Sequence, residues 1–262
     1  MNDGVYLGVI DEMKDRHNLI LEMVNQQGKI SVNELVEKLN VSVETVRRDL
    51  ALLSKHQLLY RTHGGALSKK TNDIGSAFHI RQRTNAEAKK AIAQQVVEYI
   101  YEGVVVGLDA SSTSWYVAQL LPDIPCSVVT NSMRNITALV NKPNIKTIAT
   151  GGVYSAKYDA FYGPLSEHLL SRLHIHIGIF SCVGVDNEGG IWESNELNAS
   201  MKRKMMDMSE QKFLLVDPSK FGKQNLVKLA EVSQLDMLFT QGTVPKKLQH
   251  YCEKMAVSLS IV

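Results

Sequence analysis

Residues 42–53 read Ser-Val-Glu-Thr-Val-Arg-Arg-Asp-Leu-Ala-Leu-Leu, and this stretch decides the fold of the N-terminal part of the chain. Val43, Val46, Leu50 and Leu53 recur at steps of three and four residues, which predicts a helix with one buried apolar stripe. Ser42 precedes the stripe and can cap the helix through its side-chain oxygen. The polar side chains then point outward, and they are Glu44, Thr45, Arg47 and Arg48.

Two more helices are predicted before this one. Apolar residues at helical spacing indicate a first helix from Asp11 to Gln27. The sequence Ser31-Val-Asn-Glu34 has the spacing of a capping box, so a second, short helix should begin near Val32 and end around Asn40. The short interval before the third helix is typical of a helix-turn-helix.

After the third helix the pattern changes from helical to strand-like. Residues 58–63 are rich in strand formers, Gly64-Gly65 permits a tight turn, and Ala66-Leu67 can form the returning strand. Three helices followed by a hairpin in this order predict a winged helix-turn-helix domain.

This predicted arrangement suits the binding of duplex DNA. A helix that enters the major groove needs long donors near its N-terminal half, where Arg47 and Arg48 can contact guanine edges or phosphates. Residues 41–70 carry six Lys/Arg against two Asp/Glu, whereas residues 1–68 carry eight against nine, so positive charge gathers around this helix. A charged helix face is most often only a solvated surface, but two serine caps and a basic hairpin beside it favour DNA binding. The candidate DNA-contacting residues are Ser42, Glu44, Thr45, Arg47, Arg48, Arg61, His63 and Gly64.

The remaining chain predicts a second, larger domain. A length of 262 residues is enough for two cores, and the polar segment 69–78 is interpreted as a linker between residues 11–68 and residues 79–262. Beyond it, buried apolar strands alternate with helices, which is typical of an α/β domain with a mainly parallel sheet. Strands are expected at residues 104–109, 127–130, 146–150, 174–182, 212–216, 236–240 and 256–262. Helices are expected at residues 86–101 and after Ser112, Ser132, Leu165, Asn195 and Pro245.

The composition excludes several other classes of protein. Hydrophobic residues make up 44% and charged residues 21% of the chain, as in an ordinary globular protein. No stretch approaches about 18 uncharged apolar residues, and the N-terminus lacks the order of a signal peptide. Three widely spaced cysteines without a C-x-x-C indicate neither a disulfide framework nor a zinc knuckle. The motifs of nucleotide hydrolysis, dinucleotide redox chemistry and serine hydrolases are missing. We therefore expect a cytoplasmic protein with no cofactor and no membrane partner.

The loops after the predicted strands are candidates for binding a small molecule, because open parallel sheets bind ligands there. Asp109-Ala-Ser-Ser-Thr-Ser114 starts a helix, where hydroxyls and backbone amides can bind a phosphate or can simply form a serine cap. Lys202 or Lys220 can neutralise a phosphate. Further polar loops suit a polyol, although each can also be an ordinary cap or turn; they are Thr130-Asn-Ser132, Thr150-Gly-Gly152, Cys182-Val-Gly-Val-Asp186, Trp192-Glu-Ser-Asn-Glu196 and Asp217-Pro-Ser-Lys220.

A metal site is not expected. His174 and His176 lie two residues apart on a predicted strand, so both imidazoles point the same way. No third ligand is evident near them in the sequence, and ordinary packing of two half-buried histidines is favoured over metal binding.

Two runs of residues resemble a known family. Val43-Glu-Thr-Val-Arg-Arg-Asp-Leu50, followed by Arg61-Thr-His-Gly-Gly-Ala66, resembles the DNA-binding domain of the DeoR family of bacterial sugar-metabolism regulators. Residues that resemble its effector-domain landmarks follow in order, at Asp109–Thr113, Thr130-Asn131, Gly151-Gly152, Gly184–Asp186 and Asp217–Phe221. The resemblance covers nearly the whole chain from about Arg16. It implies a C-terminal domain related to ribose-5-phosphate isomerase, a phosphorylated sugar as inducer, a homo-oligomer, and repression as the commonest mode.

The resemblance also implies roles for single residues. Residues 111–113 match the family's phosphate loop, Asp109 and Asp186 its sugar-facing acids, and Lys220 a lysine after a late strand. Many members have Gly-Thr-Thr at residues 111–113 and an aspartate in place of His176. The runs Asp109-Ala-Ser-Ser-Thr113, Phe180-Ser-Cys182 and Ser194-Asn195 look most like members that control fucose or rhamnose use. This resemblance implies a 6-deoxyketose 1-phosphate such as fuculose or rhamnulose 1-phosphate. The candidate effector-binding residues are Asp109, Ser111, Ser112, Thr113, Asn131, Gly151, Gly152, Asp186, Glu193, Asn195, Glu196, Lys202 and Lys220.

Two functions compete for this sequence. The first is a transcription regulator, most often a repressor, that binds double-stranded operator DNA as a homodimer or homotetramer and responds to a phosphorylated sugar. The alternative is a sugar-phosphate isomerase that uses Glu193 or Glu196 as its base. An enzyme leaves residues 11–67 unexplained, because they add no catalytic group yet have the layout of a DNA reader. The sequence therefore predicts a regulator without enzyme activity.

Overall fold

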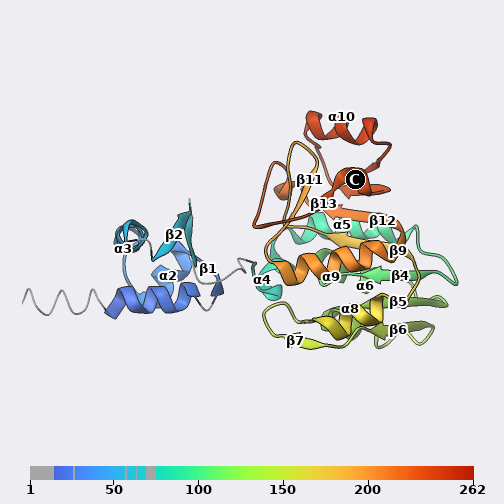
Figure 1. Cartoon of the computed structure of the whole chain (residues 1–262), viewed down its shortest axis with the longest axis horizontal. Helices are drawn as coiled ribbons and strands as arrows, with labels where there is room; N and C mark the ends of the chain where they lie inside the picture. Colours follow the sequence, from blue (N-terminus) through green and yellow to red (C-terminus); the bar gives the residue numbers. More distant parts are fainter. Residues whose placement is uncertain (1–14, 26, 57, 63, 69–74) are drawn as a thin grey trace, which may run out of the picture. The chain divides into compact units, whose positions relative to one another are not determined.

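The computed structural model describes residues 15–25, 27–56, 58–62, 64–68 and 75–262 (Figure 1). The chain forms two compact units, residues 1–76 and residues 77–262. Each unit has hydrophobic core clusters of its own.

The smaller unit is a winged helix-turn-helix. Its described part starts with a helical segment at residues 15–25. The elements that follow are β1 (Lys29–Ser31), α2 (Val32–Leu39), α3 (Val43–Lys55), β2 (Leu59–Thr62) and β3 (Gly65–Ser68). The strands form an antiparallel sheet in the order β1-β3-β2. The predicted hairpin is thus confirmed as β2 and β3, and β1 is an additional strand, too short to show a period in the sequence.

The caps of α2 and α3 form as their sequences predict. Ser31 Oγ accepts from the backbone amide of Glu34 (3.2 Å), and the Glu34 carboxylate accepts from the backbone amide of Ser31 (2.9 Å). Ser42 Oγ accepts from the backbone amide of Thr45 at 3.2 Å. The buried stripe of α3 is narrower than predicted, because Val43 lies at the first helical position and is 39% exposed.

A buried aspartate ties the first helix to α3. Arg16 donates to Asp49 through Nε (2.6 Å) and Nη2 (3.0 Å), and His17 Nε2 lies 3.0 Å from the same carboxylate. Burial alone would raise the pKa of Asp49, but the hydrogen bonds from Arg16 and His17 and their charges hold it below its ordinary value. Asp49 therefore faces inward, while its neighbour Arg48 faces solvent.

The larger unit is built on a seven-stranded parallel sheet. In chain order its strands are β4 (Val105–Leu108), β5 (Cys126–Thr130), β6 (Ile145–Ala149), β9 (Ile175–Ser181), β12 (Ser209–Val216), β14 (Met237–Thr240) and β15 (Ser258–Ile261). In space they follow the order β15-β14-β12-β9-β4-β5-β6, and each neighbouring pair is parallel. The predicted α/β class is confirmed. The order reverses between β4 and β9, and this switch point is where open α/β sheets bind ligands.

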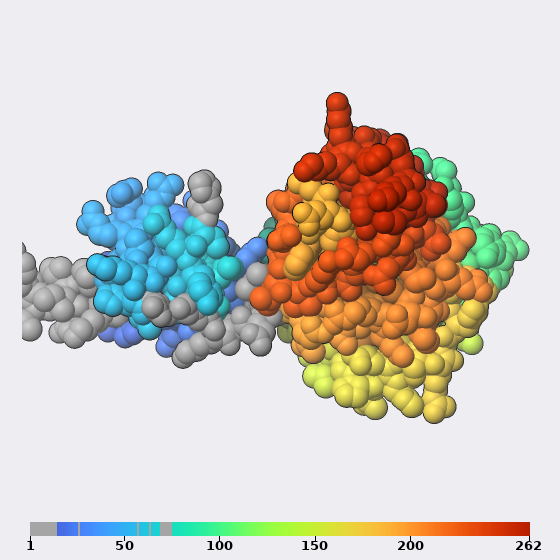
Figure 2. Space-filling view, turned by 45° about the horizontal axis from the view of Figure 1, so that its top comes forward, coloured from blue at the N-terminus to red at the C-terminus, as the bar shows by residue number. Residues whose placement is uncertain are grey.

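Helices cover both faces of this sheet. The helices α5 (Ala86–Val97), α6 (Ser112–Leu120) and α7 (Met133–Leu139) contribute to one core cluster, and α8 (Pro164–Leu170), α9 (Glu196–Asp207) and α10 (Lys246–Lys254) to the other. Within β12 the residues alternate between the clusters, with Phe213 and Leu215 in the first and Leu214 and Val216 in the second. Figure 2 shows the region of α10 (red) and the region of α8 (yellow) at opposite ends of this unit.

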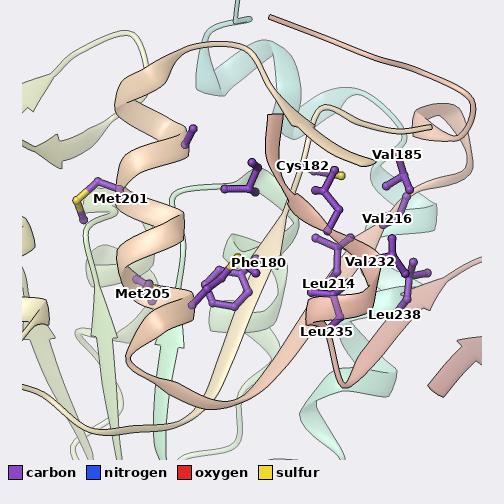
Figure 3. Close-up of a cluster of buried hydrophobic side chains, with 14 of the residues drawn as sticks. Phe180, Cys182, Val185, Met201, Met205, Leu214, Val216, Val232, Leu235 and Leu238 are labelled. Atoms are coloured by element: carbon purple, nitrogen blue, oxygen red, sulfur yellow. The ribbon is translucent and has the colours of Figure 1, made fainter. Parts of the chain in front are cut away.

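A glycine at the switch point lets α9 approach the sheet. Figure 3 shows Met205 of α9 beside Phe180 of β9. A Cβ added to Gly107 of β4 would lie 3.0 Å from Met205 Sδ, closer than ordinary packing allows. The close approach carries Lys202, one turn before Met205, to the carboxyl ends of β4 and β9.

Several short elements are absent from the sequence prediction because each has too few residues for a clear period. They are α4 (Phe78–Arg83), the β7 (Val153–Ser155) and β8 (Ala160–Tyr162) hairpin, and the antiparallel sheet of β10 (Gly184–Val185), β11 (Gly190–Glu193) and β13 (Val227–Glu231). In the described part of the chain, no helix combines the length and the apolar character needed to cross a membrane.

Candidate functional site

The exposed face of α3 carries the candidate DNA-contacting side chains. Glu44, Arg47 and Arg48 are exposed, and Thr45 is half-buried beside its cap, with Oγ1 2.9 Å from Ser42 Oγ. Arg61 of β2 is also exposed. Within the described residues, none of these three arginines has a carboxylate partner, so their donors are available for phosphates or base edges. Gly64 is exposed in the hairpin turn, and His63 lies outside the described residues.

A buried charge network occupies the switch point of the larger unit. Lys202 of α9 lies 3.1 Å from Asp109, which follows β4, and it also pairs with Glu193 of β11. Burial alone would lower the pKa of Lys202, but the charges of Glu193 and Asp109 raise it above its ordinary value. Burial alone would raise the pKa of Asp109, but Lys202 and hydrogen bonds from Ser111, Ser114 and Ser181 hold it below 3.8. Lys202 and Asp109 are therefore ionised at neutral pH, and their contacts fix them in place.

The start of α6 beside this network presents unpaired backbone amides. Ser111 is the N-cap, and its Oγ accepts from the backbone amide of Ser114 at 3.0 Å. Ser112 and Thr113 are buried, and the described residues provide no acceptor for their backbone amides. Buried amides at a helix N-terminus favour an anion, because the helix dipole and the free N–H groups both attract negative charge.

Lys220 lies beside these amides. Its Nζ donates to Ser181 Oγ at 2.7 Å and lies 3.3 Å from the Asp217 carboxylate. Ser181 Oγ is in turn 3.5 Å from Thr113 Oγ1. Thr113, Ser181 and Lys220 are thus joined by hydrogen bonds beside the start of α6. Together with Ser111 and Ser112 we call them the anion cradle: Ser111, Ser112, Thr113, Ser181 and Lys220.

A small pocket opens next to the network. Its lining residues are Asp109, Ala110, Asn131, Asn198, Met201, Lys202 and Met205. Asn131 Nδ2 donates to Phe161 O at 3.0 Å, and Asn198 Oδ1 accepts from the Tyr162 hydroxyl. Among the described residues, Oδ1 of Asn131 and Nδ2 of Asn198 have no partner. The pocket therefore offers an acceptor and a donor to sugar hydroxyls, together with the apolar side chains of two methionines.

Other candidate residues lie elsewhere or have structural contacts. Asp186 accepts from the backbone amides of Glu188 and Gly190 and from Trp192 and Gln224, so it organises the β10–β11 turn. Glu196 is exposed and pairs with Arg203. Asn195 caps α9 and donates to the Tyr158 hydroxyl at 2.9 Å.

Gly151 and Gly152 connect β6 to β7, with positive φ angles of 65° and 110°. A Cβ on Gly152 would lie 2.6 Å from Tyr162 O, so this glycine permits close backbone packing rather than ligand contact. Neither glycine lines the pocket. The structure thus brings together Asp109, residues 111–113, Asn131, Glu193, Lys202 and Lys220.

His176 of β9 and His174, which precedes the strand, have a third potential ligand in space. His174, His176 and Glu210 place ligand atoms within 4.8 Å of one another, and His174 Nε2 lies 2.8 Å from Glu210 Oε1. However, His176 Nδ1 accepts the backbone N–H of Val105 at 2.9 Å. A neutral His176 must then carry its proton on Nε2, which leaves no lone pair there for a metal. This bond favours a structural role for His176.

Sequence reasoning missed four polar residues near the site: Arg81, Lys89, Tyr162 and Asn198. Arg81 Nη2 donates to Ala110 O at 3.4 Å, and Lys89 is only 4% exposed. Arg81 lies on the short helix α4, whose pattern is too brief to detect. Lys89 lies on the predicted helix α5, where nothing in the sequence marks a lysine as buried. Asn198 lies in the first turn of α9, where the sequence pattern suggests that a polar residue faces solvent.

Both parts of the chain match known protein families. Residues 16–72 match the DeoR-like helix-turn-helix domain, and residues 84–242 match the DeoR C terminal sensor domain. The L-fucose operon activator of Haemophilus influenzae is 61% identical over 242 residues, which are 92% of this chain and 97% of that protein. The L-fucose operon activator of Escherichia coli is 36% identical over 222 residues, 84% of this chain and 91% of that protein. A solved ribose 5-phosphate isomerase A of Methanocaldococcus jannaschii is similar with a TM-score of 0.40 and 14% identity, covering 53% of this chain and 55% of that one.

Proposed function

This chain belongs to the DeoR family of transcriptional regulators, and we propose that it activates an operon for a 6-deoxy sugar in response to the corresponding ketose 1-phosphate. Membership of this family makes the chain a DNA-binding regulator with a sensor domain for a small molecule, and not an enzyme. The predictions of a regulator and of no enzyme activity are therefore confirmed.

We propose activation in place of the repression that the sequence led us to expect. The two relatives at 61% and 36% identity are both named as operon activators. Their names refer to L-fucose, which supports fucose use as the process under control and fuculose 1-phosphate as the effector. We retain rhamnulose 1-phosphate as the second compound to be tested.

The effector chemistry is supported by three neighbouring features of the switch point. The anion cradle offers the unpaired amides of Ser112 and Thr113 and the Lys220 ammonium to a phosphate. Asn131 and Asn198 offer hydrogen bonds to hydroxyls, while Met201 and Met205 offer an apolar surface to the methyl group of a 6-deoxy sugar. The single observation that carries the proposal is the pair of buried, unpaired amides beside a lysine.

An isomerase activity has no equivalent support. Glu196 is exposed and paired with Arg203, away from the pocket. Glu193 is buried and pairs with Lys202, so its carboxylate contacts that lysine rather than an open substrate position.

Thermal unfolding with and without fuculose 1-phosphate tests the effector site. A ligand at 100 times its dissociation constant adds about 2.7 kcal/mol to the stability of the native state. In Thr113→Val the side chain keeps its volume but loses a donor to the phosphate, so we expect roughly tenfold weaker binding. The matched control is Thr137→Val on α7, whose hydroxyl is exposed and donates to Met133 O.

The same protein samples are then titrated with operator DNA. We expect Thr113→Val to bind DNA as the wild type does but to need more effector for the same response. Equal effector binding by Thr113→Val and Thr137→Val would remove Thr113 from the site. Binding of no sugar phosphate by the wild type would contradict the proposed function.

We further propose residues 11–68 as the DNA-binding domain, residues 69–78 as the linker and residues 79–262 as the effector and oligomerisation domain. A homodimer or homotetramer would present α3 to both halves of a palindromic operator. Sedimentation equilibrium measures the subunit number, and a monomer that binds operator at full affinity would contradict this assembly.

A further inference from the structure

Helix α4 packs against α6, the helix whose N-terminus belongs to the anion cradle. The backbone amide of Phe78 donates to Lys157 O at 3.0 Å, and the Phe78 ring packs edge-on against Trp115 at 6.2 Å. The Tyr116 hydroxyl donates to Gln82 O at 3.2 Å. Trp115 and Tyr116 belong to the first turns of α6, so α4 rests on the helix whose N-terminus faces the candidate phosphate position.

A buried lysine holds the C-terminal end of α4. Lys89 of α5 is 4% exposed, and its Nζ donates to Arg81 O (2.6 Å) and Thr84 O (2.7 Å). These carbonyls belong to the last turn and the C-cap of α4, where a cation is favourable. An ammonium has three donors, and within the described residues Lys89 has neither a third acceptor nor a carboxylate in ion-pair contact.

This lysine carries a charge that the protein alone does not balance. Burial lowers the pKa of Lys89 to about 8, and the nearby charges of Lys220 and Arg81 act in the same direction. Asp217 acts in the opposite direction, but its carboxylate is already shared with Lys220. A buried cation of this kind is costly unless an anion joins it, and such groups gather at functional sites.

The turn between α4 and α5 is joined to the loop that carries Lys220. Asn85 Nδ2 donates to Asp217 Oδ1 at 2.7 Å and to Ser219 Oγ at 2.9 Å. Lys220 of that loop donates to Ser181 Oγ, which lies 3.5 Å from Thr113 Oγ1. The start of α5, one turn before Lys89, is therefore linked through the Lys220 loop to the start of α6, and Lys220 is near enough for its charge to lower the pKa of Lys89.

We propose that Lys89 is a further residue of the anion cradle and that it couples anion binding to the anchoring of α4. Its ammonium is shared between the last carbonyls of α4 and the anionic group of the ligand. When the cradle is empty, α4 and its C-cap provide both acceptors. When a phosphate binds, it accepts a hydrogen bond from this ammonium, and the hydrogen bonds that anchor α4 change.

The consequence concerns regulation, and it rests on the proposed function. In the sequence, α4 is the first helix of the larger unit after residues 69–74, which follow the DNA-binding fold. A ligand shifts a conformational equilibrium only through contacts that differ between the two states. The shared ammonium is such a contact, since its partners change with occupancy.

Hydrogen exchange of the full-length wild type, with inorganic phosphate as the probe, tests the coupling directly. Phosphate should change the exchange of backbone amides in residues 78–89, whereas an equal ionic strength of sodium chloride should not. An unchanged exchange rate in this segment at a phosphate concentration that raises the melting temperature would overturn the proposal.

A pair of adjacent lysines provides the variants. Lys89→Met should weaken phosphate binding at least about tenfold and remove the exchange response of α4, because the shared donor is gone. Lys90→Met is the matched control, since Lys90 is the next residue on α5 and is exposed. Lys89→Arg, which keeps the charge, should retain most of the binding. Equal phosphate affinity in Lys89→Met and Lys90→Met would contradict the proposal.

The outcome separates this inference from the proposed function. If phosphate changes α4 through Lys89 but no sugar phosphate alters DNA affinity, the proposed function fails and the coupling stands. If fuculose 1-phosphate alters DNA affinity equally in Lys89→Met and in the wild type, the effector assignment stands and the coupling is wrong.

Discussion

At the scale of single residues, a buried charge network at the switch point holds the loop that starts α6 in place. Lys202 lies between Asp109 and Glu193, and all three side chains are at most 9% exposed. The carboxylate of Asp109 also accepts the backbone amides of Ser111 and Ser181. This network therefore fixes the position of the loop that starts α6, and it contributes to the pocket mainly by positioning other groups.

Replacing Lys202 should lower the free energy of unfolding, because the network then lacks its cation. Lys202→Met leaves two buried carboxylates without a cation, so we expect a loss of about 3–5 kcal/mol in the free energy of unfolding at pH 7. Lys204→Met, on the same helix but only half-buried, should lose less than about 0.5 kcal/mol. Urea unfolding followed by tryptophan fluorescence measures both, because both tryptophans lie in the larger unit.

The same variant should also change the pH dependence of stability. In the wild type the folded pKa of Asp109 lies below 3.8, so its contribution is present above about pH 4 and is lost as the pH falls through the folded value. Without Lys202, burial raises the pKa of both carboxylates, and the folded state gains protons as the pH falls from 7 to 5. The stability deficit of Lys202→Met should therefore shrink at pH 5. A deficit that stays constant between pH 7 and pH 5 would show that the carboxylates are not desolvated.

At the scale of elements, the winged hairpin depends on one close contact between strands. A Cβ on Gly65 would lie 2.0 Å from Ile30 O, whereas a Cβ on Gly64 meets nothing within 4 Å. Gly65→Ala should therefore separate β1 from β3 and cost about 1–3 kcal/mol, while Gly64→Ala should be nearly neutral. Hydrogen exchange of the β1 and β3 amides measures the difference. Equal exchange in the two variants would show that this sheet tolerates the added carbon.

Helix α3 is the element that should read the operator. Arg48→Ala should weaken operator binding by about 1–3 kcal/mol and reduce the preference for operator over random DNA if Arg48 contacts a base. A pure phosphate contact would instead lose affinity equally on both DNAs. Lys55→Ala is the control, because Lys55 is exposed at the far end of the same helix. No loss of affinity in Arg48→Ala would exclude this residue from the interface.

The elements also show which features a sequence can predict. The helices α2, α3, α6, α7 and α9 start at or beside the predicted caps, because a cap and an apolar stripe are local signals. The seven parallel strands are predicted for the same reason, as apolar runs between helices. The strands β1 and β13 are not predicted, because they pair with distant segments, and β10 is too short to show a period.

The residues of the candidate site also divide into those that local sequence signals predict and those that they do not. Residues 109–113 and Lys220 can be predicted because they follow strands, and strand ends meet at a switch point. Asn198 and Lys89 cannot be predicted in this way, because each lies within a helix. Asn198 reaches the site only through the packing of α9, and Lys89 only through the packing of α5. Asp186 and Gly152 look like ligand residues in the sequence, yet Asp186 holds the β10–β11 turn and Gly152 packs against Tyr162 and Ser166.

At the scale of the whole molecule, the chain combines a DNA-binding unit and a sensor unit, and regulation requires that they be coupled. Effector binding and DNA binding must influence each other by the same factor, typically about 1–3 kcal/mol. Positive charge on α3 also makes DNA affinity depend on salt, so every affinity has to be compared at one ionic strength.

The most direct test is the affinity of the full-length protein for its own operator, measured at fixed salt with and without saturating fuculose 1-phosphate. We expect the affinity to change by about 5- to 150-fold, and to change much less with the neutral sugar fuculose. An operator affinity that stays the same with fuculose 1-phosphate and with rhamnulose 1-phosphate, at concentrations that saturate the sensor unit, would contradict control of DNA binding by this site.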